Sequence, residues 1–242
     1  MIHAAKKAAA LSAAALICFA GAAAAEEAAF SLHTLGVYRS DLHDFSAEIA
    51  TFYISGPASG RVIGALNAEL AALARRAVKE YEQEVSSAFK DSSRPHGHLA
   101  VTLGSAVKTD NDKIFAFDIF RTEAAGSSSE NHRFYCFDKK SGSLIELKDL
   151  FSPGYDYVGE ISGIVKKQMR AANKSEDAHY QIAPEPGGFD AIRPDHNFYI
   201  NGSGNIVICF DKYEVAPGAF GSPEFEIPYD AGNRSLSKQQ LR

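Results

Sequence analysis

Two acidic residues in the C-terminal part of the chain, Asp211 and Glu214, are the first candidates for catalytic chemistry. Glycoside hydrolysis needs two carboxyl groups that face each other across a sugar, and these two acids are close in sequence. Charged residues at the ends of strands are, however, usually solvated. The sequence contains no Gly-x-Ser-x-Gly elbow, no His-Glu-x-x-His pair and no phosphate-binding Gly-rich loop. We therefore expect no catalytic residues and a protein that is not an enzyme.

Histidines and acids that could bind a metal form a second group of candidates. Two histidines and a carboxylate are a familiar ligand set, and the residues that could supply one here are His96, His98, Asp41, His43 and Asp44. Nothing in the sequence brings the two segments together, and histidines at loop edges are usually solvated. We expect neither a metal site nor a cofactor.

Residues 1–25 have the three-part pattern of a secretory signal peptide. Lys6 and Lys7 precede an apolar run rich in alanine, and small residues end the segment. Ile17 stands before Cys18, where bacterial lipoprotein processing requires a small residue, so lipidation is not expected. We predict that the leader is removed, that no membrane span remains, and that the mature protein is periplasmic or secreted.

The composition is that of a globular, acidic protein. The chain of 242 residues is 45% hydrophobic and 23% charged, which excludes collagen, coiled coils and integral membrane proteins. Removing the leader removes Lys6 and Lys7 and changes the formal net charge from −5 to −7. Recognition of nucleic acid needs a basic surface, so we exclude a nucleic-acid partner. An acidic surface fits a basic protein partner or simple solubility.

Two cysteines, Cys136 and Cys209, remain after the leader is removed. An even number of cysteines in an oxidising compartment is consistent with a disulfide. Each lies in a strand-like run, at 133–138 and 205–211, so pairing requires neighbouring strands with both side chains on one face. The sequence leaves open whether the two thiols are bonded or free.

The first half of the chain predicts a strand, a long helix and three more strands. Residues 43–54 alternate loosely and predict a strand or a bent pair of strands. Ser59 can cap a helix whose apolar residues recur at helical spacing as far as Tyr81. Short polar turns, including residues 124–130, separate three strand-like runs, which favours an antiparallel meander. These runs are 99–108, 113–122 and 132–138.

The second half predicts another helix and a hairpin. A short strand at 143–147 leads into a helix around 157–172. Strands at 197–200 and 205–211 flank a turn rich in Asn and Gly, and a final strand covers 224–229. The expected fold class is α+β, a mainly antiparallel sheet with two main helices packed on one face and two successive strand–helix–strands subdomains. The expected parts are the leader at 1–25, a strand–helix part at 26–90, a C-terminal part at 91–230 and a flexible tail at 231–242.

Motifs in the C-terminal half carry a resemblance to a known family. They are Phe198-Tyr199-Ile200, Gly204-Asn205-Ile206-Val207-Ile208, Phe210-Asp211-Lys212-Tyr213-Glu214-Val215-Ala216-Pro217-Gly218 and Glu224-Phe225-Glu226-Ile227-Pro228. Together they resemble the extracytoplasmic domain shared by RsiV-type lysozyme-sensing anti-sigma factors and the N-terminal part of PdaC-type peptidoglycan deacetylases. Leu147-Lys148-Asp149-Leu150-Phe151 resembles the motif before that family's second helix, and the resemblance covers roughly residues 40–229.

The resemblance implies binding rather than catalysis. In RsiV-type proteins this domain is the sensor, and loops of the domain enter the active-site cleft of lysozyme. In this sequence we find no sigma-binding segment or membrane anchor of the RsiV type, so we expect no signalling role. We also find no deacetylase domain of the PdaC type, so we expect no deacetylase activity. The resemblance therefore implies an exported binding module for lysozyme or another cell-wall lytic enzyme. Binding to cell-wall glycan (peptidoglycan), or weak action on it, is the alternative.

The segment Tyr213–Gly221 is the expected binding loop. Proline and glycines fix or free its backbone, while its aromatic side chains give a surface loop an unusual apolar load. The expected binding residues are Tyr213, Glu214, Pro217 and Phe220. The alternative is that Tyr213, Val215 and Phe220 fold inward and complete the core. The sequence leaves both alternatives open.

Overall fold

The computed structural model describes residues 29–90, 97–175, 178–232 and 234–236. The predicted leader at 1–25 and the candidate metal ligand His96 lie outside these ranges. No helix within them combines the length and the apolar character needed to cross a lipid bilayer.

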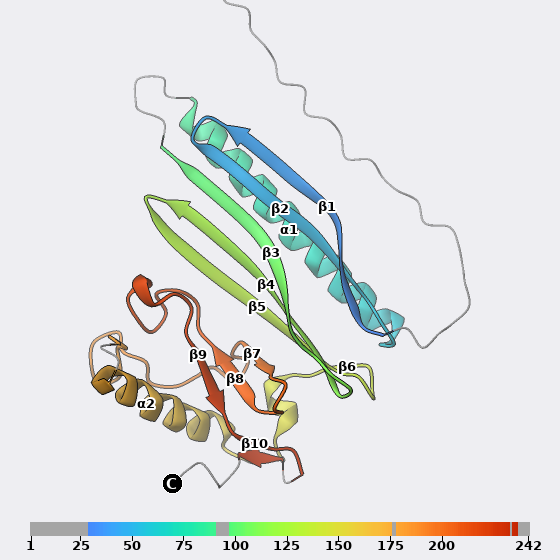
Figure 1. Ribbon diagram of the computed structural model, residues 1–242, viewed down its shortest axis with the longest axis vertical. Helices are drawn as coiled ribbons and strands as arrows, with labels where there is room; N and C mark the ends of the chain where they lie inside the picture. The colour runs from blue at the N-terminus through green and yellow to red at the C-terminus, as the bar shows by residue number, and fades with distance from the viewer. Residues whose placement is uncertain (1–28, 91–96, 176–177, 233, 237–242) are drawn as a thin grey trace, which may run out of the picture.

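A six-stranded sheet forms the larger part of the molecule (Figure 1). Its strands lie in chain order and are β1 (Ser31–Leu42), β2 (Phe45–Ser55), β3 (Leu99–Asp110), β4 (Ile114–Ala125), β5 (Ser127–Asp138) and β6 (Ser143–Leu144). Neighbouring strands are antiparallel except β2 and β3, which are parallel. A parallel pair requires a long crossover connection, and helix α1 (Gly60–Ala88) provides it.

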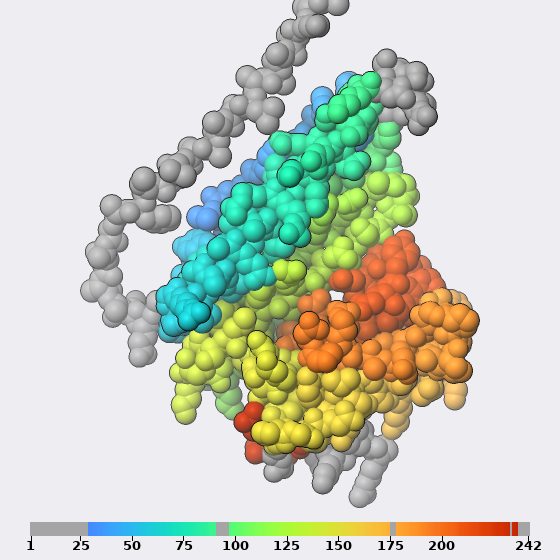
Figure 2. Space-filling view, turned by 180° about the vertical axis from the view of Figure 1, so that it is seen from behind, coloured from blue at the N-terminus to red at the C-terminus, as the bar shows by residue number. Residues whose placement is uncertain are grey.

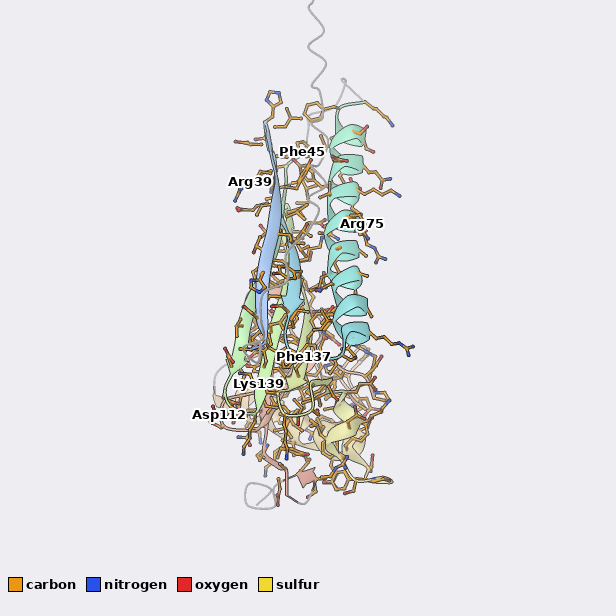
Figure 3. The ribbon with its side chains drawn as sticks, turned by 90° about the vertical axis from the view of Figure 1, so that its right-hand side faces the viewer. Arg39, Phe45, Arg75, Asp112, Phe137 and Lys139 are labelled. Atoms are coloured by element: carbon orange, nitrogen blue, oxygen red, sulfur yellow. The ribbon has the colours of Figure 1, made fainter. Side chains whose placement is uncertain are left out.

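Helix α1 lies along one face of this sheet, and Figure 3 shows Arg75 projecting from its outer side. Ser59 caps the helix as predicted, because its side chain accepts a hydrogen bond from Val62 N at 3.4 Å. Asn67 fixes the helix to β2, since its amide accepts from Ile54 N at 2.7 Å and donates to Ile54 O at 3.0 Å. The buried face follows the helical period and consists of Leu66, Leu70, Ala74, Ala77 and Tyr81.

The C-terminal part contains a second, smaller sheet. A 3-10 turn, η1 (Leu147–Leu150), leads to helix α2 (Tyr157–Ser175). The sheet is antiparallel and consists of β7 (Phe198–Ile200), β8 (Ile206–Cys209) and β9 (Glu224–Ile227). A second 3-10 turn, η2 (Gly218–Phe220), lies between β8 and β9, and β10 (Tyr229–Asp230) pairs with β11 (Ser235–Leu236).

Strands β4 and β5 are buried on both faces over residues 115–119 and 135–137. Residues that alternate along a strand point to opposite faces of a sheet. Phe117 and Phe137 therefore belong to the core that α1 covers, whereas Ala116 and Cys136 belong to the core formed with α2 and the smaller sheet. These two strands consequently join two hydrophobic cores.

The structure confirms the α+β class, the mainly antiparallel sheet and the two main helices. The placement of the helices differs from the prediction of one shared face. Helix α1 covers the six-stranded sheet, and α2 packs on the smaller sheet at β9. The reason is that the hairpin 198–209 and β9 build a sheet of their own, which gives α2 a separate surface to bury.

Strand β1 was not predicted. It is an edge strand with mostly exposed or half-buried residues, and a bulge between Thr34 and Gly36 interrupts its alternation. The predicted turn at 124–130 is also strand, apart from Gly126, which supplies the positive φ of +84° that the tight connection needs.

Part of the predicted C-terminal tail is docked on the body of the protein. Leu236 is buried in β11, and Arg234 Nη2 donates to Phe151 O at 3.0 Å. The described residues of 231–242 therefore contribute to the fold.

Both cysteines are buried free thiols, so the disulfide alternative is not realised. Strand β7 contacts β5 and pairs with β8, so that it lies between the strands of the two cysteines. The Cys136 thiol contacts the backbone of Ile200 at one end of β7. Cys209 N donates to Asn197 O at 3.1 Å at the opposite end of β7. Three residues of strand span about 10 Å, more than the roughly 7 Å that a disulfide allows between Cα atoms.

We expect both thiols to be unreactive in the native protein and reactive after unfolding. Burial raises the pKa of Cys136 to about 12 and also raises the pKa of Cys209, so neither forms a thiolate at neutral pH. Maleimide labelling of the protein without its leader, followed by intact-mass measurement, should add no label to the folded protein and two labels in denaturant without reductant. A single disulfide and no label in denaturant would contradict the structure.

Candidate functional site

The segment that follows β8 forms hydrogen bonds with the edge of β5 that has no strand partner. His132 N donates to Asp211 Oδ1 at 2.8 Å, and Lys212 N donates to Glu130 O at 3.1 Å. Asn197 Nδ2 donates to His132 O at 2.9 Å. A strand edge without partners would expose unpaired backbone groups. These contacts fix the start of the next loop against the six-stranded sheet.

Tyr213 begins that loop in a strained conformation. Its φ is +71°, a left-handed value that costs a residue with a side chain about 1–2 kcal/mol. Its side chain is 54% exposed, and Lys212 Nζ lies 5.4 Å from its ring centroid. The ring lies against Gly218, where a Cβ atom would come within 2.2 Å of it. Glycine at 218 is therefore required for this position of the tyrosine ring.

The remaining apolar residues of the loop divide between surface and core. Phe220 is 39% exposed, and its ring centroid lies 5.9 Å from that of His179 and 6.5 Å from that of Tyr180. Val215 is 2% exposed and belongs to the core, and its carbonyl accepts from Gln181 N at 3.0 Å. Val215 thus completes the core, whereas Tyr213 and Phe220 do not fold inward. We call Tyr213–Gly221, with its exposed Tyr213 and Phe220, the aromatic loop.

Glu214 and Pro217 have different positions in the aromatic loop. The Glu214 carboxylate accepts from Asp211 N at 2.9 Å and lies 3.4 Å from Arg193 Nη1, so it stabilises the base of the loop. Pro217 is exposed and directly precedes η2. The Asp211 carboxylate accepts a hydrogen bond from His132 N in β5, so Asp211 and Glu214 do not face each other across an open site.

A buried histidine–carboxylate pair lies next to the anchor of the aromatic loop. His132 Nδ1 is 2.7 Å from Asp118 Oδ2, and the Asp118 side chain is almost fully buried. Burial opposes protonation of His132. The hydrogen bond and charge of Asp118, together with the charges of Glu130 and Asp211, outweigh burial and raise the pKa of His132 above its usual value. The pair joins β4 and β5 where the smaller part of the protein docks.

Two hollows flank this junction. One of about 490 Å³, which we call the arginine groove, lies between α1, β4 and β5 and the segment 193–197, on the side shown in Figure 2. Its lining includes Arg76, Arg121, Arg133 and Arg193. The other, of about 370 Å³, is mostly apolar and includes Phe134, Glu146, Tyr157, Asp195 and His196. We call it the apolar groove.

Two of the candidate metal ligands, His98 and His43, have other contacts. Within the described ranges, no three side chains of His, Cys, Asp or Glu are arranged to hold a metal ion. His98 Nε2 accepts a hydrogen bond from Gly126 N at 3.4 Å, and the His43 ring centroid lies 6.0 Å from that of Phe89.

Comparison with known proteins identifies the class of domain. Residues 148–230 match the family DUF3298, described as a protein of unknown function. Two crystal structures of DUF3298 proteins share the fold. The one from Bacteroides fragilis has a TM-score of 0.61 at 17% identity and covers 89% of this chain and 96% of its own. The one from Pseudomonas aeruginosa has a TM-score of 0.54 at 16% identity and covers 88% and 96%.

A DUF3298 domain therefore occupies the C-terminal part of this chain. The chain is homologous to the anti-sigma-V factor RsiV of Bacillus subtilis, with 32% identity over 187 residues. The alignment covers 76% of this chain and 62% of RsiV, so the chain spans less than two thirds of that relative. The predicted resemblance is confirmed.

Sequence reasoning missed the buried pair and the arginine groove. Asp118 did carry a signal, because it is an acid within the otherwise apolar run 114–120 of a buried strand. The four arginines of the groove carried no such signal in the sequence, since they come from four separate segments whose proximity depends on the fold.

We expect His132 to stabilise the protein more at acidic than at alkaline pH. A folded-state pKa above the unfolded value of about 6.5 gives stability that is fully present below that value and lost as pH rises through the folded pKa. Urea unfolding of the wild type and His132→Gln should show a difference in free energy of unfolding that is largest near pH 5.5 and smaller at pH 8.5. An equal difference at both pH values would contradict this.

We expect stability to separate the outward and inward residues of the aromatic loop. Val215→Ala should lower the free energy of unfolding by about 1.5–3 kcal/mol, because it removes buried apolar surface. Tyr213→Ala should leave the free energy of unfolding nearly unchanged. The free energy of unfolding of Tyr213→Gly should be about 1 kcal/mol higher than that of Tyr213→Ala, since glycine adopts the positive φ freely. Chemical denaturation of the three variants measures these values. A loss for Tyr213→Ala equal to that for Val215→Ala would place the tyrosine in the core.

Proposed function

We propose that this protein is an exported, non-catalytic binding module that recognises a lysozyme-like or other cell-wall lytic enzyme. The observation that carries the proposal is the aromatic loop, an ordered surface loop that exposes Tyr213 and Phe220 on a domain homologous to RsiV. RsiV is an anti-sigma factor, a class of protein that is not an enzyme. The family resemblance adds lysozyme sensing as the function of the corresponding domain.

The aromatic loop has the properties of a preorganised binding surface. Its base is hydrogen-bonded to β5, its interior is anchored by Val215, and Gly218 admits the Tyr213 ring. Large aromatic side chains that are ordered before binding lose little conformational freedom when a partner covers them. Strained residues are also concentrated at binding sites, and Tyr213 is one.

The charge of the chain supports a basic partner. Its formal net charge is −5, and −7 without the predicted leader. Complementary charge accelerates the encounter with a basic enzyme more than it increases the final affinity. The aromatic side chains would then provide most of the binding free energy.

Calorimetric titration against a panel of lysozymes tests the proposal, with inhibition of lysozyme turnover as the second measurement. We expect binding and inhibition by the wild type. Tyr213→Ala and Phe220→Ala should each weaken binding by about 2 kcal/mol or more. Gly218→Ala should weaken it similarly, because the added methyl group displaces the Tyr213 ring.

Leu35→Ala is the matched control. Leu35 on β1 is 54% exposed, as Tyr213 is, but lies in a different part of the chain. Its substitution should leave binding unchanged. Absence of heat and of inhibition with every lysozyme at micromolar concentrations, or equal loss in Leu35→Ala, would overturn the proposal.

Binding of cell-wall glycan is the second candidate, and the apolar groove is the observation that favours it. Sugar sites combine an aromatic surface with carboxylates, and this groove has Tyr157 beside Glu146 and Asp195. Pull-down on purified peptidoglycan distinguishes the two candidates. Retention that Tyr157→Ala abolishes and Tyr213→Ala leaves intact would favour glycan, whereas no retention would leave the enzyme partner.

A further inference from the structure

The arginine groove brings four arginines together on an otherwise acidic protein. Arg76 comes from α1, Arg121 from β4, Arg133 from β5 and Arg193 from the segment before β7. Only two acids, Asp195 and Asp211, share the lining with these four guanidinium groups. Since the formal net charge of the chain is −5, this local excess of arginine runs against the general composition.

Acids outside the lining hold three of the four arginines in place. Arg121 Nη1 is 2.5 Å from Glu80 Oε2, and Arg121 Nη2 is 2.9 Å from Glu123 Oε2. Arg133 Nη1 is 2.5 Å from Glu69 Oε1. Ion pairs of this kind restrict the rotamers of long side chains, so these guanidinium groups are oriented before any ligand arrives.

Arg193 is held in the same way, by Glu214 at 3.4 Å. The acid Asp211 is occupied, because it accepts from His132 N at 2.8 Å and from Asn131 Nδ2 at 3.3 Å. Asp195 lies 3.8 Å from Arg193 Nε and is well exposed. Arg121, Arg133 and Arg193 therefore each have an acid beside them, and Arg76 is the arginine of the lining without one among the described residues.

Two donors in the groove lack an acceptor. Arg76 is exposed and makes no ion pair or hydrogen bond with any residue that the structure describes. Arg121 Nε is buried and has no hydrogen-bond partner in the same part of the chain. Buried donors are rarely left unpaired, so the Arg121 Nε group indicates a missing acceptor.

We propose that the arginine groove binds a small anion with several carboxylate or phosphate groups. Arg76 donates to its oxygens, and Arg121, Arg133 and Arg193 complete the surroundings of the anion. Guanidinium groups suit this role because their planar donors match carboxylate and phosphate oxygens in pairs. The volume of about 490 Å³ admits a molecule of the size of citrate or pyrophosphate. No residue of the aromatic loop lines the groove, and the proposal does not rest on the proposed function.

Citrate and pyrophosphate are the probes, titrated calorimetrically into the full chain at low ionic strength. Binding of citrate alone indicates a carboxylate ligand, binding of pyrophosphate alone a phosphate ligand, and binding of both a general oxyanion site. Each of these results supports the proposal. Arg76→Gln should weaken binding at least tenfold, and the arginine Nε–H NMR signal of Arg121 should shift when the probe is added.

Arg75→Gln is the matched control, because it removes the same charge from the neighbouring position. Arg75 is exposed, does not line the groove, and projects away from the sheet (Figure 3). Its substitution should change the affinity less than twofold, and Tyr213→Ala should leave it unchanged. No binding of either probe at millimolar concentration, or equal weakening by Arg75→Gln and Arg76→Gln, would overturn the proposal. Loss of lysozyme binding with retained anion binding would affect only the proposed function.

Discussion

The burial of both faces of β4 and β5, over residues 115–119 and 135–137, is the constraint on which the rest of this structure depends. One face carries large aromatic residues such as Phe117 and Phe137, which pack beneath α1. The other face carries Ala116 and Cys136, small residues that allow the second core to approach closely. Strands buried on both sides are stabilised by two sets of apolar contacts at once. The two parts of the chain are therefore packed on a shared pair of strands.

This sharing has a consequence for the edge of the sheet. Strand β6 covers β5 only at Phe137 and Asp138, so the backbone at Glu130 and His132 needs other partners. The segment after β8 supplies them through Asp211 and Lys212. The same contacts that satisfy the strand edge determine where the aromatic loop begins, and the left-handed conformation of Tyr213 follows directly after them. The contacts of Asp211 and Lys212 with β5 thus both stabilise the fold and determine the position of the exposed aromatic residues.

The junction presents two chemically different surfaces. The aromatic loop is apolar and suits a partner that covers a large area, whereas the arginine groove is charged and suits a compact anion. Glu214 links them, because it supports the loop through Asp211 and also lies beside Arg193. The buried His132–Asp118 pair joins β4 and β5 beside the arginine groove, so its protonation acts where the two parts of the protein meet.

Much of the fold was accessible from the sequence because local patterns dominate it. The period of α1, its Ser59 cap and the alternating strands β3 to β5 are properties of short segments. The resemblance of the 198–228 motifs was confirmed by homology to RsiV. Strand β1 escaped prediction because it is an exposed edge with a bulge, and its order comes from pairing with β2 rather than from its own pattern.

The sequence by itself determined the fold class, the apolar period of helix α1 and which loop carries unusual aromatic residues. Only the tertiary structure decided that α2 packs on a separate sheet, that β7 keeps Cys136 and Cys209 apart, and that Val215 turns inward while Tyr213 and Phe220 stay exposed. It also brought together the arginines of the groove from four distant segments. The physical reason is that spacing along the chain encodes local periodicity, whereas contacts between distant residues arise only when several buried surfaces are satisfied at the same time.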